Sequence, residues 1–137
     1  MIHGYTETGV ETYRLNQIRK LLTPEFMKSN IGSYLIGCAL ETNLWLSAKS
    51  IAQVFRARGG TDLAPHLQEM KVPTLVINGQ HDTSLEPGRR TAERTPGATH
   101  KILPNTSHAC CIEDPAAFDI LVIDFLRAHK LMPTSPT

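Results

Sequence analysis

The sequence predicts an α/β fold, because its second half alternates two short apolar runs with two helix patterns. A β-branched run at residues 72–77 precedes a polar helical stretch at residues 86–94, and a weaker strand pattern at residues 100–103 precedes a helix after residue 114. Short apolar runs without alternation are typical of strands buried on both faces of a parallel sheet. Strand, helix, strand and helix in this order indicate a right-handed parallel βαβ unit followed by a further helix.

The last of these helices has the clearest amphipathic pattern of the chain. Asp114 is expected to cap it, with Pro115 in its first turn. Its apolar residues recur at helical spacing, which predicts one face packed against the sheet. These residues are Phe118, Leu121, Val122, Phe125 and Leu126.

The first half of the chain, to about residue 58, has helical patterns only. Thr23 followed by Pro24 indicates a helix start, and two consecutive glycines after residue 58 indicate a helix end. The apolar run at residues 26–46 contains Gly32 and Gly37 and predicts one or two short helices. The expected helices are therefore residues 11–22, the region after Pro24, and residues 47–58.

Composition excludes several classes of protein. The 137 residues amount to about one domain, and 41% hydrophobic with 20% charged residues is typical of a globular chain. Lys and Arg number 14 against 13 Asp and Glu, a net charge of +1 without a basic block, so nucleic acid is not an expected partner. There is no long apolar stretch and no signal-peptide pattern at the start, so we expect a cytoplasmic protein without a membrane partner.

Cysteine and histidine spacing gives no indication of a metal or cofactor. The three cysteines, Cys38, Cys110 and Cys111, are odd in number and lack a CxxC pair, so we expect buried or half-buried thiols and no disulfide framework. Four histidines share no metal-ligand spacing, and surface positions are expected for them. They are His3, His66, His100 and His129.

Polar residues that could carry chemistry follow the two predicted strands. His81 and Asp82 come after the first strand, and Ser107 and His108 come after the second. The carboxyl ends of adjacent parallel strands meet at one edge of a sheet, where an aspartate can orient an imidazole to act as a base for a nucleophile. The alternative is a solvated aspartate and an unpartnered loop histidine, which composition alone favours.

Three motifs in order make the segment from about residue 61 to residue 130 resemble the C-terminal end of an α/β-hydrolase. VPTLVINGQHD at residues 72–82 resembles the family's acid-bearing strand and turn, and PGA with LPN at residues 96–105 resembles the approach to its last loop. Ser107 and His108, with the Glu, Pro and Phe residues after them, resemble its histidine signature. The resemblance implies that Asp82 is the triad acid and His108 the triad base.

The resemblance also implies a domain organisation. Residues 1–60 correspond, by position only, to the helical cap or lid of these enzymes, residues 61–131 to the C-terminal core segment, and residues 132–137 to a tail. The implied fold is a partial α/β-hydrolase with a short parallel sheet, flanking helices and an N-terminal cap-like region. The loop and strand residues also resemble, weakly, proline-iminopeptidase-like members.

Two further polar residues near the expected pair have simpler interpretations. His81 adjoins the acid and is expected to be a turn residue rather than a second base. Glu113 precedes the Asp114 cap, so we expect a structural role near a positive helix terminus.

The nucleophile of the family is missing from this sequence. It should stand in a G-x-S-x-G turn before the acid, yet no serine before Asp82 has glycine at both flanking positions, and Cys38 also fails this test. An HGGG-type oxyanion loop is absent as well. We therefore expect the sequence to begin after the nucleophile, with Ser33, Ser107 and Cys110 as the first residues to test if hydrolysis occurs without it.

Three functions follow from this pattern. The favoured one is a truncated α/β-hydrolase, whose complete form cleaves an ester, amide, lactone or similar bond in a small molecule, with this chain alone inactive or nearly so. The others are one chain of a two-chain hydrolase and a non-catalytic binding module. The first strand has no predicted neighbour on one side, so self-association or a complementary chain is also expected. No substrate-binding residue is assigned.

Overall fold

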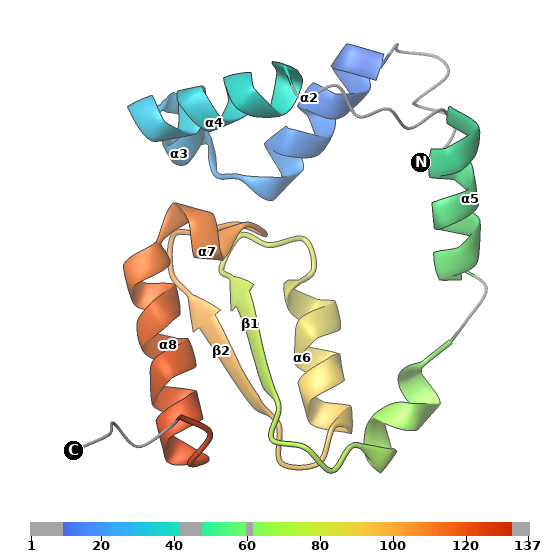
Figure 1. Cartoon of the computed structure of the whole chain (residues 1–137), viewed down its shortest axis with the longest axis vertical. Helices are drawn as coiled ribbons and strands as arrows, with labels where there is room; N and C mark the ends of the chain where they lie inside the picture. Colours follow the sequence, from blue (N-terminus) through green and yellow to red (C-terminus); the bar gives the residue numbers. More distant parts are fainter. Residues whose placement is uncertain (1–9, 42–47, 60–61, 133–137) are drawn as a thin grey trace. The chain divides into compact units, whose positions relative to one another are not determined.

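The computed structural model describes residues 10–41, 48–59 and 62–132. The chain divides into two compact units, Met1–Pro65 and His66–Thr137 (Figure 1). Along the chain, a short 3₁₀ helix, η1 (Ala64–Glu69), spans the boundary between them. The first unit is helical and the second is the α/β unit that contains the expected site.

The described residues of the first unit form four helices, close to the ranges that the sequence predicts. The apolar run divides at Ser29 and not at a glycine, because the Ser29 hydroxyl donates to the Phe26 carbonyl at 2.6 Å and accepts from the Gly32 N–H at 3.0 Å. Thr23 is the N-cap of the helix that begins at Pro24, and its Oγ1 accepts from the Phe26 N–H at 3.2 Å. The helices are α2 (Val10–Leu21), α3 (Pro24–Lys28), α4 (Asn30–Glu41) and α5 (Ala48–Gly59).

The second unit is built on a parallel two-stranded sheet. The register places Leu75 opposite Thr99 and Gly79 opposite Leu103. The strands are connected by a helix, so the predicted parallel βαβ unit and the α/β fold class are confirmed. In chain order the elements are β1 (Leu75–Gly79), α6 (Leu85–Arg94), β2 (Thr99–Leu103), α7 (Cys110–Glu113) and α8 (Pro115–Ala128).

Strand β1 begins three residues later than the sequence predicts and includes the polar end of the run. Pro73 has no N–H to donate, and the Thr74 hydroxyl donates to the Val72 carbonyl at 3.0 Å, so this segment turns before the ladder starts. The first hydrogen bond to the neighbouring strand runs from the Thr99 N–H to the Thr74 carbonyl at 2.9 Å. The short helix α7 was not predicted, because four residues are too few for a periodic pattern.

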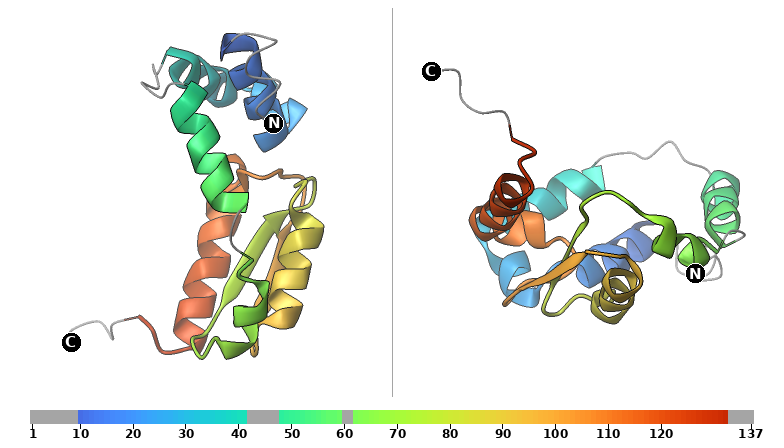
Figure 2. Two further views of the ribbon diagram at one scale, coloured as in Figure 1. Left: turned by 90° about the vertical axis from the view of Figure 1, so that its right-hand side faces the viewer. Right: turned by 90° about the horizontal axis from the view of Figure 1, so that it is seen from below.

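Helices α6 and α8 lie on opposite sides of the sheet (Figures 1 and 2). Side chains alternate along each strand, and Leu75 and Thr99 line a hollow of about 270 Å³ together with Phe125 of α8. Asn78 faces the other way, against Gly88 of α6. The five apolar residues of the predicted α8 stripe are all half-buried, so this face contacts the sheet without being enclosed.

Two expectations about side-chain exposure are wrong in part. Cys110 is buried, but Cys38 and Cys111 are exposed rather than buried or half-buried. His100 lies in β2 and is half-buried instead of at the surface. In the part of the chain that the structure describes, no helix has the length and apolar character needed to cross a membrane, and no three metal-binding side chains are grouped.

Candidate active site

The loops that follow β1 and β2 are joined by backbone hydrogen bonds at the carboxyl edge of the sheet. The Gln80 N–H donates to the Leu103 carbonyl at 2.8 Å, and the His81 N–H donates to the Thr106 carbonyl at 2.9 Å. Asn105 turns the second loop with φ 56°, a left-handed conformation that asparagine tolerates better than most residues. These hydrogen bonds hold the two loops together, and we call the joined loops the platform.

Gly79 allows the second loop to lie directly on the end of β1. A Cβ at this position would lie 2.1 Å from the Ser107 carbonyl oxygen and 2.5 Å from the Thr106 carbonyl oxygen. Both obstacles are backbone atoms, so any larger residue would push the loop away. The glycine at the end of the strand thus sets how close the loop carrying His108 comes to the loop carrying Asp82.

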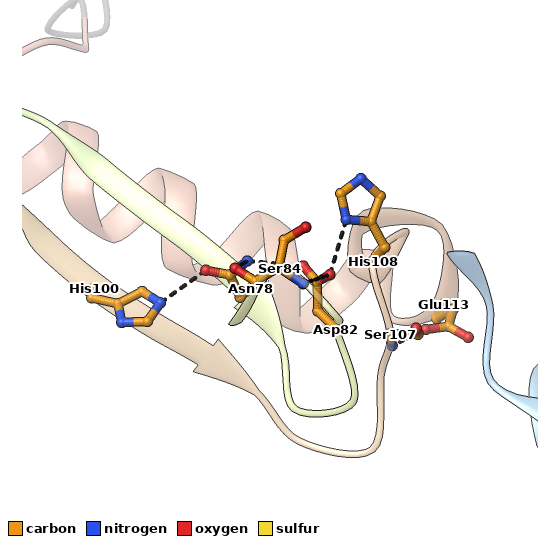
Figure 3. A network of polar contacts seen from close by, with 7 residues as sticks. All are labelled: Asn78, Asp82, Ser84, His100, Ser107, His108 and Glu113. Atoms are coloured by element: carbon orange, nitrogen blue, oxygen red, sulfur yellow. Dashed lines mark hydrogen bonds and ion pairs between the residues drawn. The ribbon is translucent and has the colours of Figure 1, made fainter. Parts of the chain in front are cut away.

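Asp82 and His108 form a hydrogen bond on this platform (Figure 3). The Asp82 Oδ1 atom lies 3.0 Å from the His108 Nδ1 atom. The carboxylate is buried, with 3% of its side chain exposed, whereas 49% of the imidazole is exposed. The predicted meeting of these two residues at neighbouring loops is confirmed.

The Asp82 carboxylate is held by two further donors. The Ser84 N–H donates to Oδ1 at 2.7 Å, and the Asn78 amide nitrogen donates to Oδ2 at 2.8 Å. Burial acts to raise the pKa of Asp82, but the hydrogen bonds from Ser84, Asn78 and His108, with the charge of His108, lower this pKa below its ordinary value. The carboxyl group is therefore kept as an anion in a fixed orientation.

The direction of the Asp82 bond determines the state of the imidazole. An ionised carboxylate only accepts hydrogen bonds, so the proton of neutral His108 lies on Nδ1. Its Nε2 atom then carries a lone pair on a ring that is half-exposed. A proton taken up at Nε2 would be stabilised by the adjacent carboxylate, which is the chemistry of a general base.

Glu113 holds the His108 loop from the other side. Its Oε2 atom accepts a hydrogen bond from the Ser107 N–H (Figure 3). Inside the loop, the Thr106 hydroxyl donates to the Leu103 carbonyl at 3.1 Å. The structural role expected for Glu113 is thus present, but it acts on the histidine loop through the backbone of the preceding residue.

Three other histidines of the described residues do not bond to Asp82 or His108. His81 is exposed in the turn beside Asp82, as expected. His66 is exposed and lies 3.4 Å from Glu69. Exposed His129 contacts the Phe125 ring at a centroid distance of 4.5 Å, with the two ring planes tilted by 53°. His3 lies outside the described residues.

The alternative nucleophiles are poorly suited to attack. Burial raises the pKa of the Cys110 thiol, and nearby Cys111 and Asp82 raise it further, so this thiol stays protonated and weakly reactive. Ser33 lies in α4 of the other unit, where its hydroxyl donates to the Met27 carbonyl at 3.2 Å. Ser107 is buried in the histidine loop.

Sequence reasoning missed two strand residues that support Asp82, Asn78 directly and His100 through Asn78. Asn78 is a buried polar side chain at the end of an apolar strand, and the amide nitrogen also lies 3.3 Å from the Ser84 carbonyl. His100 Nε2 lies 2.9 Å from Asn78 Oδ1. A polar residue inside an otherwise apolar strand, four positions before the acid, was the available signal.

Comparison with known proteins assigns the fold. No protein-family model and no curated protein matches the sequence. Among solved structures, the chain is similar to the enol-lactonase from Burkholderia xenovorans LB400, with a TM-score of 0.78, 26% identity and coverage of 92% of this chain and 48% of that one. The chain is also similar to a hydrolase from Pseudomonas aeruginosa PA01, with a TM-score of 0.74, 25% identity and coverage of 91% of this chain and 47% of that one.

A third similar structure, a thermophilic esterase from Thermogutta terrifontis, supports the fold alone, with a TM-score of 0.73, 18% identity and coverage of 93% of this chain and 47% of that one. The chain spans about half the length of each of these three structures. It therefore has a partial α/β-hydrolase fold, as the motifs predict.

Proposed function

We propose that this chain is the acid- and base-bearing part of an α/β-hydrolase that cleaves an ester, lactone or similar bond in a small molecule. In this proposal Asp82 is the triad acid and His108 the triad base, and the serine nucleophile comes from polypeptide outside these 137 residues. The observation that carries it is the buried carboxylate bonded to a half-exposed imidazole at the carboxyl edge of parallel strands. This is the edge at which open α/β sheets place their sites.

The proposed mechanism uses the two nitrogen atoms of His108 separately. Nε2 removes the proton of the serine hydroxyl as the serine oxygen attacks the carbonyl carbon of the substrate. The resulting imidazolium is stabilised by the Asp82 carboxylate at Nδ1, and its Nε2 proton then passes to the leaving group. Water, activated by the same nitrogen, hydrolyses the acyl-serine.

The similar structures favour a carbonyl ester over an amide. The one that names a bond at 25% identity or more is described as an enol-lactonase, at 26% identity. In the proposal residues 1–60 are the cap-like region of the enzyme, as their position in the chain suggests. The similarity to proline iminopeptidases, which would favour an amide, stays a prediction.

Complementation by the missing half would test the proposal. The segment of the Burkholderia enol-lactonase that lies outside the match is joined to or mixed with this chain, and hydrolysis of an aryl ester is followed. We expect no serine-dependent hydrolysis from this chain alone and measurable turnover from the completed enzyme. His108→Gln and Asp82→Asn should each reduce that turnover by about 10³-fold or more.

His81→Gln provides the matched control, because His81 is an exposed histidine in the same turn as the acid. It should leave turnover nearly unchanged. A completed enzyme that folds but hydrolyses equally well with and without the His108 imidazole would contradict the proposal. Binding of esters without turnover in a folded complex would instead support a non-catalytic module.

A further inference from the structure

A continuous row of polar side chains runs from β2 to the exposed imidazole. In Figure 3, His100, Asn78, Asp82 and His108 follow one another in this order. The three heavy-atom distances along the row are 2.9 Å, 2.8 Å and 3.0 Å. The row links two strands and both loops of the site, so the acid is fixed to the sheet as well as to its own turn.

The partners of Asn78 determine which way its amide points. The Asp82 Oδ2 atom and the Ser84 carbonyl oxygen are both acceptors, so the group that faces them must be the NH₂ group of the amide. The amide oxygen therefore faces His100, and the Nε2 atom of His100 must carry a proton to bond it. A flipped amide would place its oxygen against the Asp82 Oδ2 atom, so that two acceptors would face each other and the hydrogen bond to Oδ2 would be lost.

The space that this amide occupies comes from a missing side chain. Gly88 of α6 lies so close to Asn78 that a Cβ there would be 2.0 Å from the Asn78 Oδ1 atom and 2.9 Å from its Cγ atom. Since the Asn78 residue is only 7% exposed, its amide has nowhere else to turn. Three elements thus fix the amide of Asn78 on β1. His100 of β2 supplies the donor, and Gly88 of α6 provides the space.

We propose that Asn78 is a positioning residue for Asp82, and that His100 and Gly88 hold its amide in the orientation that aims the carboxylate at His108. The inference rests on the proposed function in that Asp82 is taken as the triad acid. The Asn78 N–H bond occupies Oδ2, and the carboxylate plane is thereby set so that Oδ1 meets the Nδ1 atom of His108. His100 is linked to the reacting imidazole through three hydrogen bonds and touches no substrate.

The test is a ¹³C NMR titration of the Asp82 carboxyl group in the whole chain, combined with the Nδ1 proton resonance of His108. His100→Leu removes the donor to Asn78, so the pKa of Asp82 should rise relative to the unmodified chain and the His108 resonance should weaken. His100→Gln keeps an N–H donor at the end of the side chain and should restore both. His66→Leu, at an exposed histidine outside the row, should change neither.

Gly88→Ala gives a second variant that removes no hydrogen-bonding group. It should displace the Asn78 amide and reproduce the effects of His100→Leu. An unchanged circular dichroism spectrum would show that the variant is folded. An Asp82 pKa that stays unchanged in both folded variants, or a His100→Gln variant that behaves like His100→Leu, would overturn the inference. Failure of the proposed function would look different, because the completed enzyme would lack turnover while the Asp82 pKa still responded to His100.

Discussion

Asp82 is the residue on which the fold and the site depend together. Its carboxylate accepts hydrogen bonds from a strand residue, from its own turn and from the opposite loop, and it is almost fully buried. Asp82 and His108 could be predicted because each stands in a local motif after a strand. The contact between Asn78 and His100 could not, because it depends on a strand register that places Val76 opposite His100, and periodicity alone does not determine register.

The lowered pKa of Asp82 predicts a specific dependence of stability on pH. A carboxyl group whose pKa is lower in the folded than in the unfolded chain contributes stability above its unfolded pKa of about 3.9, and this contribution is lost as the pH falls toward the folded value. Asp82→Asn should therefore be less stable than the unmodified chain at pH 7, and the difference should shrink below pH 4.

Urea unfolding of the two chains at pH 7 and pH 3 measures this difference. Asp119→Asn is a matched control, because Asp119 is exposed on α8 outside the site. A difference between the Asp82 variant and the unmodified chain that is equal at both pH values would contradict the account of the carboxylate.

At the scale of the elements, local signals predict helix ends better than strand ends. Helix α8 starts at Pro115 because the Asp114 carboxylate accepts from the Ala117 N–H at 3.0 Å, and both residues are visible in the sequence. The start of β1 depends on the turn at residues 72–74 and also on a partner in another strand, so it lies three residues later than expected. How far the apolar face of α8 is buried likewise depends on contacts with other elements, which the helix pattern alone does not determine.

Truncation of the α8 face should have a moderate cost. Phe125 is half-buried beside the hollow at the sheet, and its ring contacts that of His129. Phe125→Ala should therefore lower the free energy of unfolding by about 2 kcal/mol, less than the 3–5 kcal/mol typical of an enclosed ring. Ile120→Ala on the same helix, at 58% exposure, should change it by less than about 0.5 kcal/mol. Equal effects in chemical denaturation would show that the assigned face is wrong.

The residues that the structure describes enclose few apolar side chains. No large side chain there is fully buried, and within that part of the chain β1 pairs with β2 alone. A short apolar strand with one open edge can accept a further strand. The sequence predicted this open edge, since it contains no pattern for another strand. We propose that a second polypeptide, either a copy of this chain or the nucleophile-bearing part, pairs with β1.

Sedimentation velocity at micromolar concentration should therefore show species larger than the monomer. Addition of the nucleophile-bearing segment should replace them with a defined complex, and the amides of β1 should become more protected from hydrogen exchange. A chain that stays monomeric, with β1 already fully protected on both sides, would contradict this proposal.

The hydrogen bond to Asp82 holds the His108 imidazole with Nε2 ready to accept a proton. Long-range ¹H–¹⁵N correlation spectra of the imidazole rings near neutral pH report directly which nitrogen carries the proton in the neutral form. We predict His108 with its proton on Nδ1 and a bare Nε2, a preference that Asp82→Asn abolishes, while exposed His81 shows mixed tautomers. A proton on Nε2 of His108, or a spectrum for His108 like that of His81, would contradict the account.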